Sequence, residues 1–234
     1  TGSDVGSPPH VKVYNPQSGA FIFSFYAYST AFTGGVRVAM GDVNGDAFPD
    51  LITVPGVGGG SEVKVFDGRT GQLIRWFFAF PGLTTGFYIA AADVNGDRID
   101  DIVVGTDAGT AARVRVFDGA STTQIWDVFA FGSFFGGVRV AAADVNGDGF
   151  ADVICGAGQG SLVRVYSRGI AVQDFYAFGA FGGGVYVAGG DVTGDGLADV
   201  IVGAGAGGQP LVNLFVGGVL QRSFLAYPSG FRGG

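Results

Sequence analysis

The chain has 234 residues, of which 47% are hydrophobic and only 14% are charged, and its formal net charge is −7. Gly and Asp interrupt every apolar segment, so no run approaches the roughly 18 apolar residues that a membrane-spanning helix needs. The acidic balance and the lack of a basic run argue against nucleic acid as a partner. We therefore expect neither membrane insertion nor nucleic-acid binding, and an all-β chain of this length can form one domain.

In chain order, the first expected strands are VKVY at residues 11–14 and an apolar segment at 21–28 that ends in FYAY. Alternating apolar residues with many β-branched and aromatic members favour strands, and no window has a convincing helical period. The sole histidine, His10, precedes the first strand in SPPH, where we expect an exposed turn. The single cysteine, Cys155, rules out an internal disulfide framework and is expected in the core.

From residue 36 onward a pattern of strands recurs at offsets close to 50 residues. The first strand of each unit is expected at 36–39, 87–90, 138–141 and 185–188, and the second at 50–54, 101–105, 152–156 and 199–203. The third is expected at 63–66, 114–117, 163–166 and 212–215, and the fourth ends in an aromatic-Ala-aromatic signature at 77–80, 128–131, 175–178 and 224–227. Four antiparallel strands in roughly 50 residues is the size of a propeller blade.

The units divide the chain into a single repeat domain, residues 1–234. The expected parts are a half blade at 1–33 and blades at 34–84, 85–135, 136–182 and 183–234. The prediction is therefore a β-propeller of four-stranded antiparallel blades, about 4.5 to 5 in number, with an incomplete N-terminal blade. A half blade exposes a strand edge, and three explanations stay open: flanking sequence, a divergent fifth blade, or completion by strands of a neighbouring molecule, which would make a polymer.

A nine-residue motif lies between the first and second strands of each unit. It reads DVNGDAFPD from Asp42 and recurs from Asp93, Asp144 and Asp191. Asn-Gly between apolar strands is a strong hairpin signal, so one interpretation is a bare turn. A turn does not require Asp at positions 1, 5 and 9, and three carboxylates in one loop repel one another unless a cation or raised pKa values relieve them. Oxygen ligands at alternating positions of a tight loop with a Gly at the bend are what Ca²⁺ prefers.

The spacing predicts about four Ca²⁺ sites. Side-chain ligands are expected from Asp42, Asn44, Asp46 and Asp50; Asp93, Asn95, Asp97 and Asp101; Asp144, Asn146, Asp148 and Asp152; and Asp191, Thr193, Asp195 and Asp199. Backbone oxygens of Phe48, Ile99, Phe150 and Leu197 are expected at position 7. Four bound ions would move the formal charge from −7 to about +1, which favours a structural role for the metal.

The repeated strands and the DVNGDxxxD loops resemble the FG-GAP or VCBS-type repeats of integrin α-subunit propellers and of bacterial secreted proteins. The resemblance spans nearly the entire chain and places a calcium loop between the first and second strands of each blade. It implies a propeller at the cell surface or outside the cell, where millimolar calcium would fill weak sites.

Residues for catalysis are scarce in the sequence, which has no G-x-S-x-G, H-E-x-x-H or phosphate-binding loop, so we expect no enzyme. Candidate ligand-binding residues are Arg37, Tyr88, Arg139 and Tyr186, at equivalent positions of the first strands; packing between blades is the competing interpretation. Lys12, Lys64, Arg115 and Arg164 recur on the third strands, where we expect pairing with loop carboxylates or contact with solvent.

Two functions follow from these patterns. The first is a non-enzymatic, calcium-binding structural or adhesive module outside the cell, self-assembling into a fibre as its half blade is completed in trans. The second is a lectin-like propeller that binds a glycan or a cell-surface protein. Fold alone does not choose between them.

Overall fold

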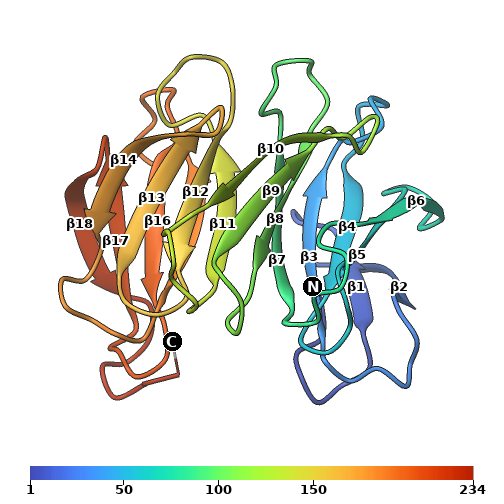
Figure 1. Ribbon diagram of the computed structural model, residues 1–234, viewed down its shortest axis with the longest axis horizontal. Helices are drawn as coiled ribbons and strands as arrows, with labels where there is room; N and C mark the ends of the chain where they lie inside the picture. The colour runs from blue at the N-terminus through green and yellow to red at the C-terminus, as the bar shows by residue number, and fades with distance from the viewer. Residues whose placement is uncertain (234) are drawn as a thin grey trace.

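The computed structural model describes residues 1–233 as strands joined by loops and turns, with no helix in that range (Figure 1). The two-stranded sheet pairs β1 (His10–Tyr14) with β2 (Phe21–Tyr26). The first four-stranded sheet holds β3 (Val36–Gly41), β4 (Asp50–Pro55), β5 (Glu62–Phe66) and β6 (Leu73–Phe78), and the second holds β7 (Phe87–Ala92), β8 (Asp101–Thr106), β9 (Arg113–Phe117) and β10 (Gln124–Phe129). The third holds β11 (Val138–Ala143), β12 (Asp152–Ala157), β13 (Leu162–Ser167) and β14 (Ile170–Tyr176), and the last holds β15 (Val185–Gly190), β16 (Asp199–Ala204), β17 (Leu211–Val216) and β18 (Val219–Leu225).

Each sheet is a blade in which strands follow one another in chain order and every paired neighbour is antiparallel. The blades are stacked in a row through their first strands, with β3 against β7, β7 against β11 and β11 against β15. The row stays open, because the β1–β2 sheet and the β15–β18 sheet lie at opposite sides of Figure 1. The predicted all-β fold of propeller blades with an incomplete N-terminal blade is confirmed.

The second strand of each inner blade explains the high apolar content. All six residues of β4, β8 and β12 are buried, because neighbouring blades cover both faces of these strands. A sheet covered on both faces needs continuous apolar runs in place of alternation. Cys155 of β12 is fully buried, as expected, and burial raises the pKa of its thiol.

The aromatic-Ala-aromatic signature lies at the end of the fourth strand and only partly within it. In the first complete blade β6 ends at Phe78, and Ala79 leaves the strand to donate its backbone N–H to the carbonyl of Ser61, 2.9 Å away. The equivalent amides of Ala27, Ala130, Ala177 and Ala226 donate in the same way to carbonyls that precede the third strands. The motif therefore joins the third and fourth strands at one end of each blade. The expected fourth strands extended about two residues beyond the observed ones.

A second recurring contact joins each blade to the one before it. The third strand sends a polar side chain to the carbonyl of the alanine in the preceding aromatic-Ala-aromatic motif. The donor-to-oxygen distances are 3.1 Å from Lys64 to Ala27, 2.7 Å from Arg115 to Ala79, 2.9 Å from Arg164 to Ala130 and 2.8 Å from Asn213 to Ala177. Lys64, Arg115 and Arg164 therefore do not pair with loop carboxylates, which was one of the two expectations. Besides those carbonyls they pair with strand carboxylates of their own blades, at Glu62, Asp127 and Asp174. Lys12 is exposed, which agrees with the other expectation, contact with solvent.

The N-terminal half blade has more structure than two strands. Gly2 bridges Val11, the N–H of Ser3 donates to the carbonyl of His10, and the N–H of Lys12 donates to the carbonyl of Thr1. Residues 1–3 therefore cover part of the inner edge of β1. His10 is the first residue of β1 and stacks on Tyr26 with ring centroids 4.8 Å apart, which corrects the expected turn. Within residues 1–233, no helix is present that would be long and apolar enough to cross a membrane.

Candidate functional site

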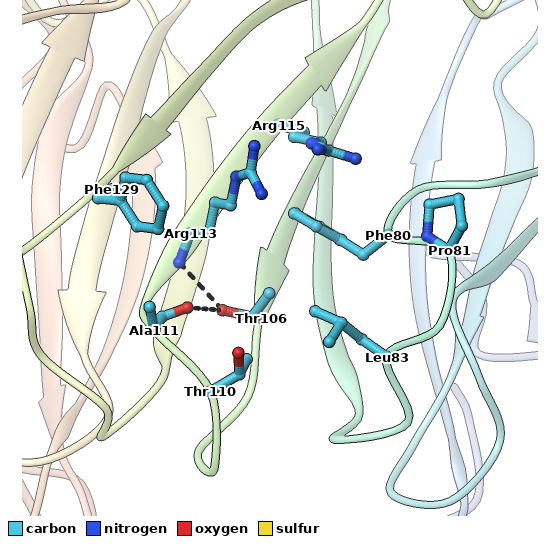
Figure 2. A pocket seen from close by; sticks show the side chains of 9 residues that line it. All are labelled: Phe80, Pro81, Leu83, Thr106, Thr110, Ala111, Arg113, Arg115 and Phe129. Carbon is cyan, nitrogen blue, oxygen red and sulfur yellow. Dashed lines mark hydrogen bonds between the residues drawn. The ribbon is translucent and has the colours of Figure 1, made fainter.

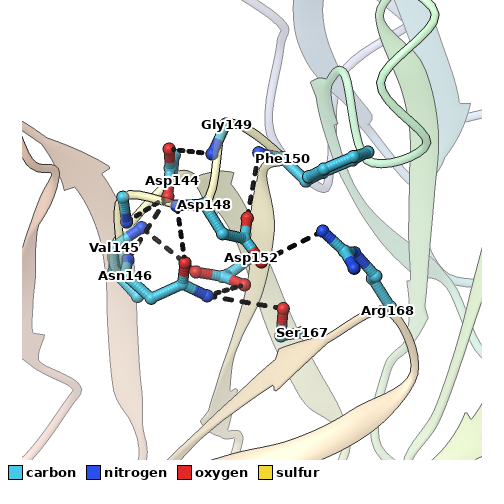
Figure 3. Close-up of polar contacts among 10 residues, drawn as sticks. Asp144, Val145, Asn146, Asp148, Gly149, Phe150, Asp152, Ser167 and Arg168 are labelled. Atoms are coloured by element: carbon cyan, nitrogen blue, oxygen red, sulfur yellow. Dashed lines mark hydrogen bonds and ion pairs between the residues drawn. The ribbon is translucent and has the colours of Figure 1, made fainter.

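The Asp motifs form one loop per complete blade, between the first and second strands. Each motif begins directly after its first strand, and its ninth residue is the first residue of the second strand, as with Asp152 at the start of β12 (Figure 3). The sequence therefore positioned all four loops correctly. It did not predict their backbone, because a two-residue Asn-Gly hairpin needs positive φ at both residues. In the first loop positive φ occurs at Gly45 (79°) and Ala47 (66°), which makes a longer loop.

The carboxylate at position 1 organises the loop backbone. Asp144 Oδ2 accepts the N–H of Gly149 at 2.9 Å (Figure 3). Its Oδ1 accepts the N–H of Gly147 at 2.7 Å. Asp148 at position 5 accepts the N–H of Phe150 at 3.0 Å. The same amide contacts recur at the equivalent residues of the other loops.

The carboxylate at position 9 lies at the bottom of each loop. Asp50, Asp101, Asp152 and Asp199 are all buried. Asp152 accepts the N–H of Val145 at 3.1 Å and the amide Nδ2 of Asn146 at 3.0 Å. Burial raises the pKa of Asp101 to about 6, against the backbone hydrogen bonds that lower it. Burial also raises the pKa of Asp50, with a further increase from the nearby negative charges of Asp46 and Asp42.

The four loops lie in a row and are hydrogen-bonded to one another. The N–H of Asp100 donates to the carbonyl of Asp42 at 2.8 Å, that of Ala151 to Asp93 at 2.8 Å, and that of Ala198 to Asp144 at 2.9 Å. The side chain of Asp100 adds a contact with the N–H of Asp42 at 2.9 Å, which ties the second loop to the first. We call this continuous edge, residues 42–50, 93–101, 144–152 and 191–199, the loop row.

The donor set of each loop fits an oxygen-ligated cation, because it supplies three carboxylates, a neutral side-chain oxygen and a backbone carbonyl. In residues 1–233, however, no three His, Cys, Asp or Glu side chains are gathered in an arrangement that would hold a metal. The carboxylates are near neighbours, since Asp42 and Asp46 act on the pKa of Asp50, yet they point at loop amides. The predicted calcium sites therefore remain a prediction.

The candidate ligand residues of the first strands are brought together as an alternating row. The guanidinium of Arg37 lies 3.8 Å from the ring centroid of Tyr88, and that of Arg139 lies 4.0 Å from the ring of Tyr186 and 5.7 Å from Tyr88. Arg37 also donates to the carbonyl of Phe87 at 2.8 Å and pairs with Asp107 at 2.7 Å. These contacts cross from blade to blade, so the competing interpretation, packing between blades, accounts for the residues.

Sequence reasoning missed a charged cluster on the second complete blade. Arg113 and Arg115 of β9 both pair with Asp127 of β10. The two arginines line a groove of about 250 Å³ (Figure 2). The signal was the sequence RVR, since the other third strands have a single cation or none at these two positions. Recognising it also required the strand register that places Asp127 opposite Arg115.

An open row of four-stranded antiparallel blades, with an Asp loop between the first two strands of each complete blade, defines a propeller-type repeat protein. Comparison with known families agrees. The FG-GAP-like repeat family matches residues 93–155 and the FG-GAP repeat family matches residues 136–187. Integrin alpha-V of Gallus gallus is 31% identical over 83 residues, which are 34% of this chain and 8% of the integrin. Residues 93–187 thus match FG-GAP repeats, and together with the fold these matches support an FG-GAP repeat, propeller-like protein.

Solved structures show the same fold at low sequence identity. BBS1N, crystallised in complex with ARL6DN, superposes with a TM-score of 0.61 at 13% identity, covering 97% of this chain and 64% of that one. The exotype rhamnogalacturonan lyase YesX gives 0.59 at 15% identity, covering 96% of this chain and 44% of the lyase. The rhamnogalacturonan lyase PL11 of Bacillus licheniformis gives 0.58 at 14%, with 96% and 46% covered. The chain spans less than two thirds of each relative, and the likeness to these structures is one of fold alone.

Proposed function

We propose that the protein is a non-enzymatic, calcium-binding structural or adhesive module that acts outside the cell or at its surface and associates end to end with further copies of itself. The observation that carries the proposal is the uncovered face of the last blade. Ile201, Leu214 and Phe224 line a groove of about 310 Å³ there, together with Val192 and Arg222. Apolar grooves of this kind on a protein surface mark interaction sites.

The equivalent face of every earlier complete blade is covered by the next blade. Ile154 of β12 and Val163 of β13 are fully buried against residues of β15 and β16. Their counterparts in the last blade, Ile201 and Val212, are partly exposed, and all of β18 is exposed. The partner that this face fits is therefore a propeller blade.

A second copy of this chain presents a matching face on its half blade. Lys12 of β1 holds the register position of Lys64, Arg115, Arg164 and Asn213, each of which donates to the carbonyl of an alanine in the preceding blade. Ala226, after β18, holds the place of those alanines, because its N–H makes the same contact, here to Pro210 at 2.9 Å. Docking Lys12 of one copy on Ala226 of the next would repeat an interface that the chain already contains.

Sedimentation velocity over a concentration series tests the association. The unaltered protein should form dimers and longer species as its concentration rises, and Phe224→Asp and Lys12→Glu should each shift the distribution towards monomers. Ile170→Asp is the matched control, because Ile170 is 70% exposed on β14 and lies outside both faces. A monomer at all concentrations, or association that both variants leave intact, would contradict this part of the proposal.

Calcium binding is proposed from the loop row. Each loop would hold its ion through the side chains at positions 1, 3, 5 and 9 and the carbonyl at position 7. The ion would neutralise carboxylates such as Asp42 and Asp46, whose negative charge adds to the raised pKa of Asp50. At a free calcium concentration of about 100 times Kd, one site would add roughly 2.7 kcal/mol to stability, so four independent sites would add about 11 kcal/mol. A typical domain is stable by only about 5–15 kcal/mol.

Thermal melting with calcium and with a chelator, at equal ionic strength near the physiological value, tests the metal. The melting temperature should fall by tens of degrees on chelation, and isothermal titration of the apo protein should count about four ions. An unchanged melting temperature would overturn calcium binding and leave the association proposal standing.

We base the proposed absence of catalysis on the surroundings of the two residues whose side chains are best suited to catalysis. His10 is stacked on Tyr26, and the Cys155 thiol is buried with a raised pKa. Three similar structures are rhamnogalacturonan lyases, so incubation with rhamnogalacturonan is the direct test. Absorbance from an unsaturated product should stay at the background level, and an increase would overturn this part of the proposal.

A lectin-like function is the second candidate. Its original basis, the row of Arg37, Tyr88, Arg139 and Tyr186, is occupied in contacts between blades, although half of Tyr186 is exposed. A glycan array probed with the unaltered protein and with Arg37→Ala and Arg139→Ala would support this candidate if the variants lost binding.

A further inference from the structure

A groove on the side of the row lies between the β3–β6 blade and the β7–β10 blade. Phe80 and Leu83, which follow β6, form one wall, and Arg113 and Arg115 of β9 form the other (Figure 2). Thr110 lies at the lower end in that view, and Phe129 flanks Arg113. The groove measures about 250 Å³, which is just below the usual range for small-molecule sites and suits one sugar residue.

The groove carries an excess positive charge. Arg113 and Arg115 share a single carboxylate, Asp127: Arg113 Nε donates to Oδ1 at 2.6 Å and Arg115 Nε donates to Oδ2 at 2.9 Å, while Arg113 Nη2 also contacts Oδ2. Two guanidinium groups against one carboxylate leave a net charge of +1. A bound carboxylate would bring the cluster to neutrality.

Donors remain available on the groove wall. Arg115 uses Nη1 on the carbonyl of Ala79 at 2.7 Å, so within residues 1–233 Arg113 Nη1 and Arg115 Nη2 have no acceptor. The Thr106 hydroxyl is fully used, because it accepts the N–H of Arg113 and donates to the carbonyl of Ala111. Guanidinium donors held in a fixed orientation by their other hydrogen bonds are well suited to binding a carboxylate.

The packing of the blades does not require Arg113. The residues at its register position in the other blades are His10, Glu62, Leu162 and Leu211. Contact with the preceding blade is made by the residue two places on, which is Arg115 here and Lys64 or Arg164 elsewhere. Arg113 is therefore an addition specific to this groove, and a role in stacking the blades does not explain it.

We propose that this groove binds a carboxylate-bearing sugar, a uronic acid residue of an acidic glycan. The free guanidinium donors of Arg113 and Arg115 would hold the carboxylate. The ring of Phe129 has the Arg113 guanidinium 5.2 Å from its centroid and is still 55% exposed, so its exposed part would pack against the sugar ring. The site is separate from the loop row and from the two end faces, so it depends on neither calcium nor association.

Isothermal titration in calcium-containing buffer at low salt tests the site with three probes: trigalacturonate, neutral galactotriose and triaspartate peptide. Trigalacturonate should bind and galactotriose should not, because the charge is the main attraction. No binding of trigalacturonate up to about 10 mM would overturn the proposal, as would tighter binding of triaspartate, which would assign the site to acidic peptides.

The variant Arg113→Leu makes the test specific, since Leu162 and Leu211 occupy the equivalent positions and the blade tolerates leucine there. Affinity for trigalacturonate should fall by about ten- to a hundredfold, the effect of losing a charged hydrogen bond. Arg69→Leu is the matched control, because it removes the same charge from an exposed turn elsewhere and should change affinity by less than about twofold. Equal effects of the two variants would overturn the proposal.

Discussion

The inner blades and the last blade have nearly the same sequence pattern but different surroundings. Val43 and Val94 of the first two loops are buried, at 0% and 2% exposure, whereas the equivalent Val192 is 62% exposed. The strands DVICG and DVIVG, which begin β12 and β16, differ at one residue, yet β12 is buried throughout and β16 is not. In this fold a residue is therefore buried by the neighbouring blade. The sequence of a repeat determines that a strand forms, but it does not determine whether another blade covers that strand.

The sharpest test of this comparison is a matched pair of core truncations. Ile154→Ala should lower the free energy of unfolding by about 2–5 kcal/mol, because it leaves a cavity between two blades. Ile201→Ala, at the equivalent position of the last blade, should lower it by about 1 kcal/mol or less. Urea denaturation of dilute, monomeric protein measures both, and equal losses would contradict the comparison.

A second pair compares a loop carboxylate with a surface one. Asp152→Ala should lower stability by about 1–3 kcal/mol even with chelator present, because the N–H of Val145 and the amide of Asn146 lose their buried acceptor. Asp174→Ala removes a carboxylate that pairs with Arg164 on a more exposed strand, and should lower stability by about 1 kcal/mol or less. If calcium binds, only the Asp152→Ala difference should grow when calcium replaces the chelator.

A third pair uses the contact that joins neighbouring blades. Lys64→Met should lower stability by about 1–3 kcal/mol, because the carbonyl of Ala27 loses its charged donor. Lys12→Met changes the same residue type at the same register position, where the structure has no preceding blade, and should leave the monomer within about 0.5 kcal/mol of the parent. Denaturation at low protein concentration distinguishes them, and a large loss in Lys12→Met would show that its face is covered in the monomer.

The smallest expected effect concerns the pH dependence of the charged cluster. Burial alone would raise the pKa of Asp127, but hydrogen bonds from Arg113 and Arg115 outweigh it and hold the pKa below the ordinary 3.8. A carboxylate whose pKa is lower when folded adds stability that is present above its unfolded pKa and is lost as the pH falls through the folded one. The stability difference between the parent and Asp127→Asn should therefore stay constant near neutral pH and narrow below about pH 4. A difference that does not narrow there would show that Asp127 is not held ionised by the arginines.

Most of the fold could be predicted from the sequence because the strands and blades follow from patterns among residues that are close together in the chain. The alternation in VKVF and the continuous, mostly apolar run in DLITV indicate the strands, and the spacing of the Asp motifs indicates the blades. Strand ends were less accurate, since nothing local shows that Ala79 turns away to contact Ser61. The partial strand made by residues 1–3 was missed for the same reason, as its pairing with β1 is non-local.

The candidate sites divide in the same way. The loop residues were predictable in place, because one motif supplies all of them, but the direction of each carboxylate depends on loop amides such as that of Gly147. Clusters assembled from separate strands were not predictable. Asp127 meets Arg113 and Arg115 only through the register of β9 and β10. Arg37 meets Tyr88 only because the two blades are stacked.

The backbone hydrogen bonds along the loop row have a consequence for how the row responds to ligand. Each loop shares a bond with the loop before it, from Asp100 to Asp42, Ala151 to Asp93 and Ala198 to Asp144. When one loop becomes ordered, the loop bonded to it becomes more ordered as well, so the second loop loses less conformational entropy when it binds a ligand. Neighbouring loops are therefore coupled along the row. If the row binds calcium as proposed, its ions should fill it with a Hill coefficient above one, so that the row would respond to calcium more steeply than four separate sites.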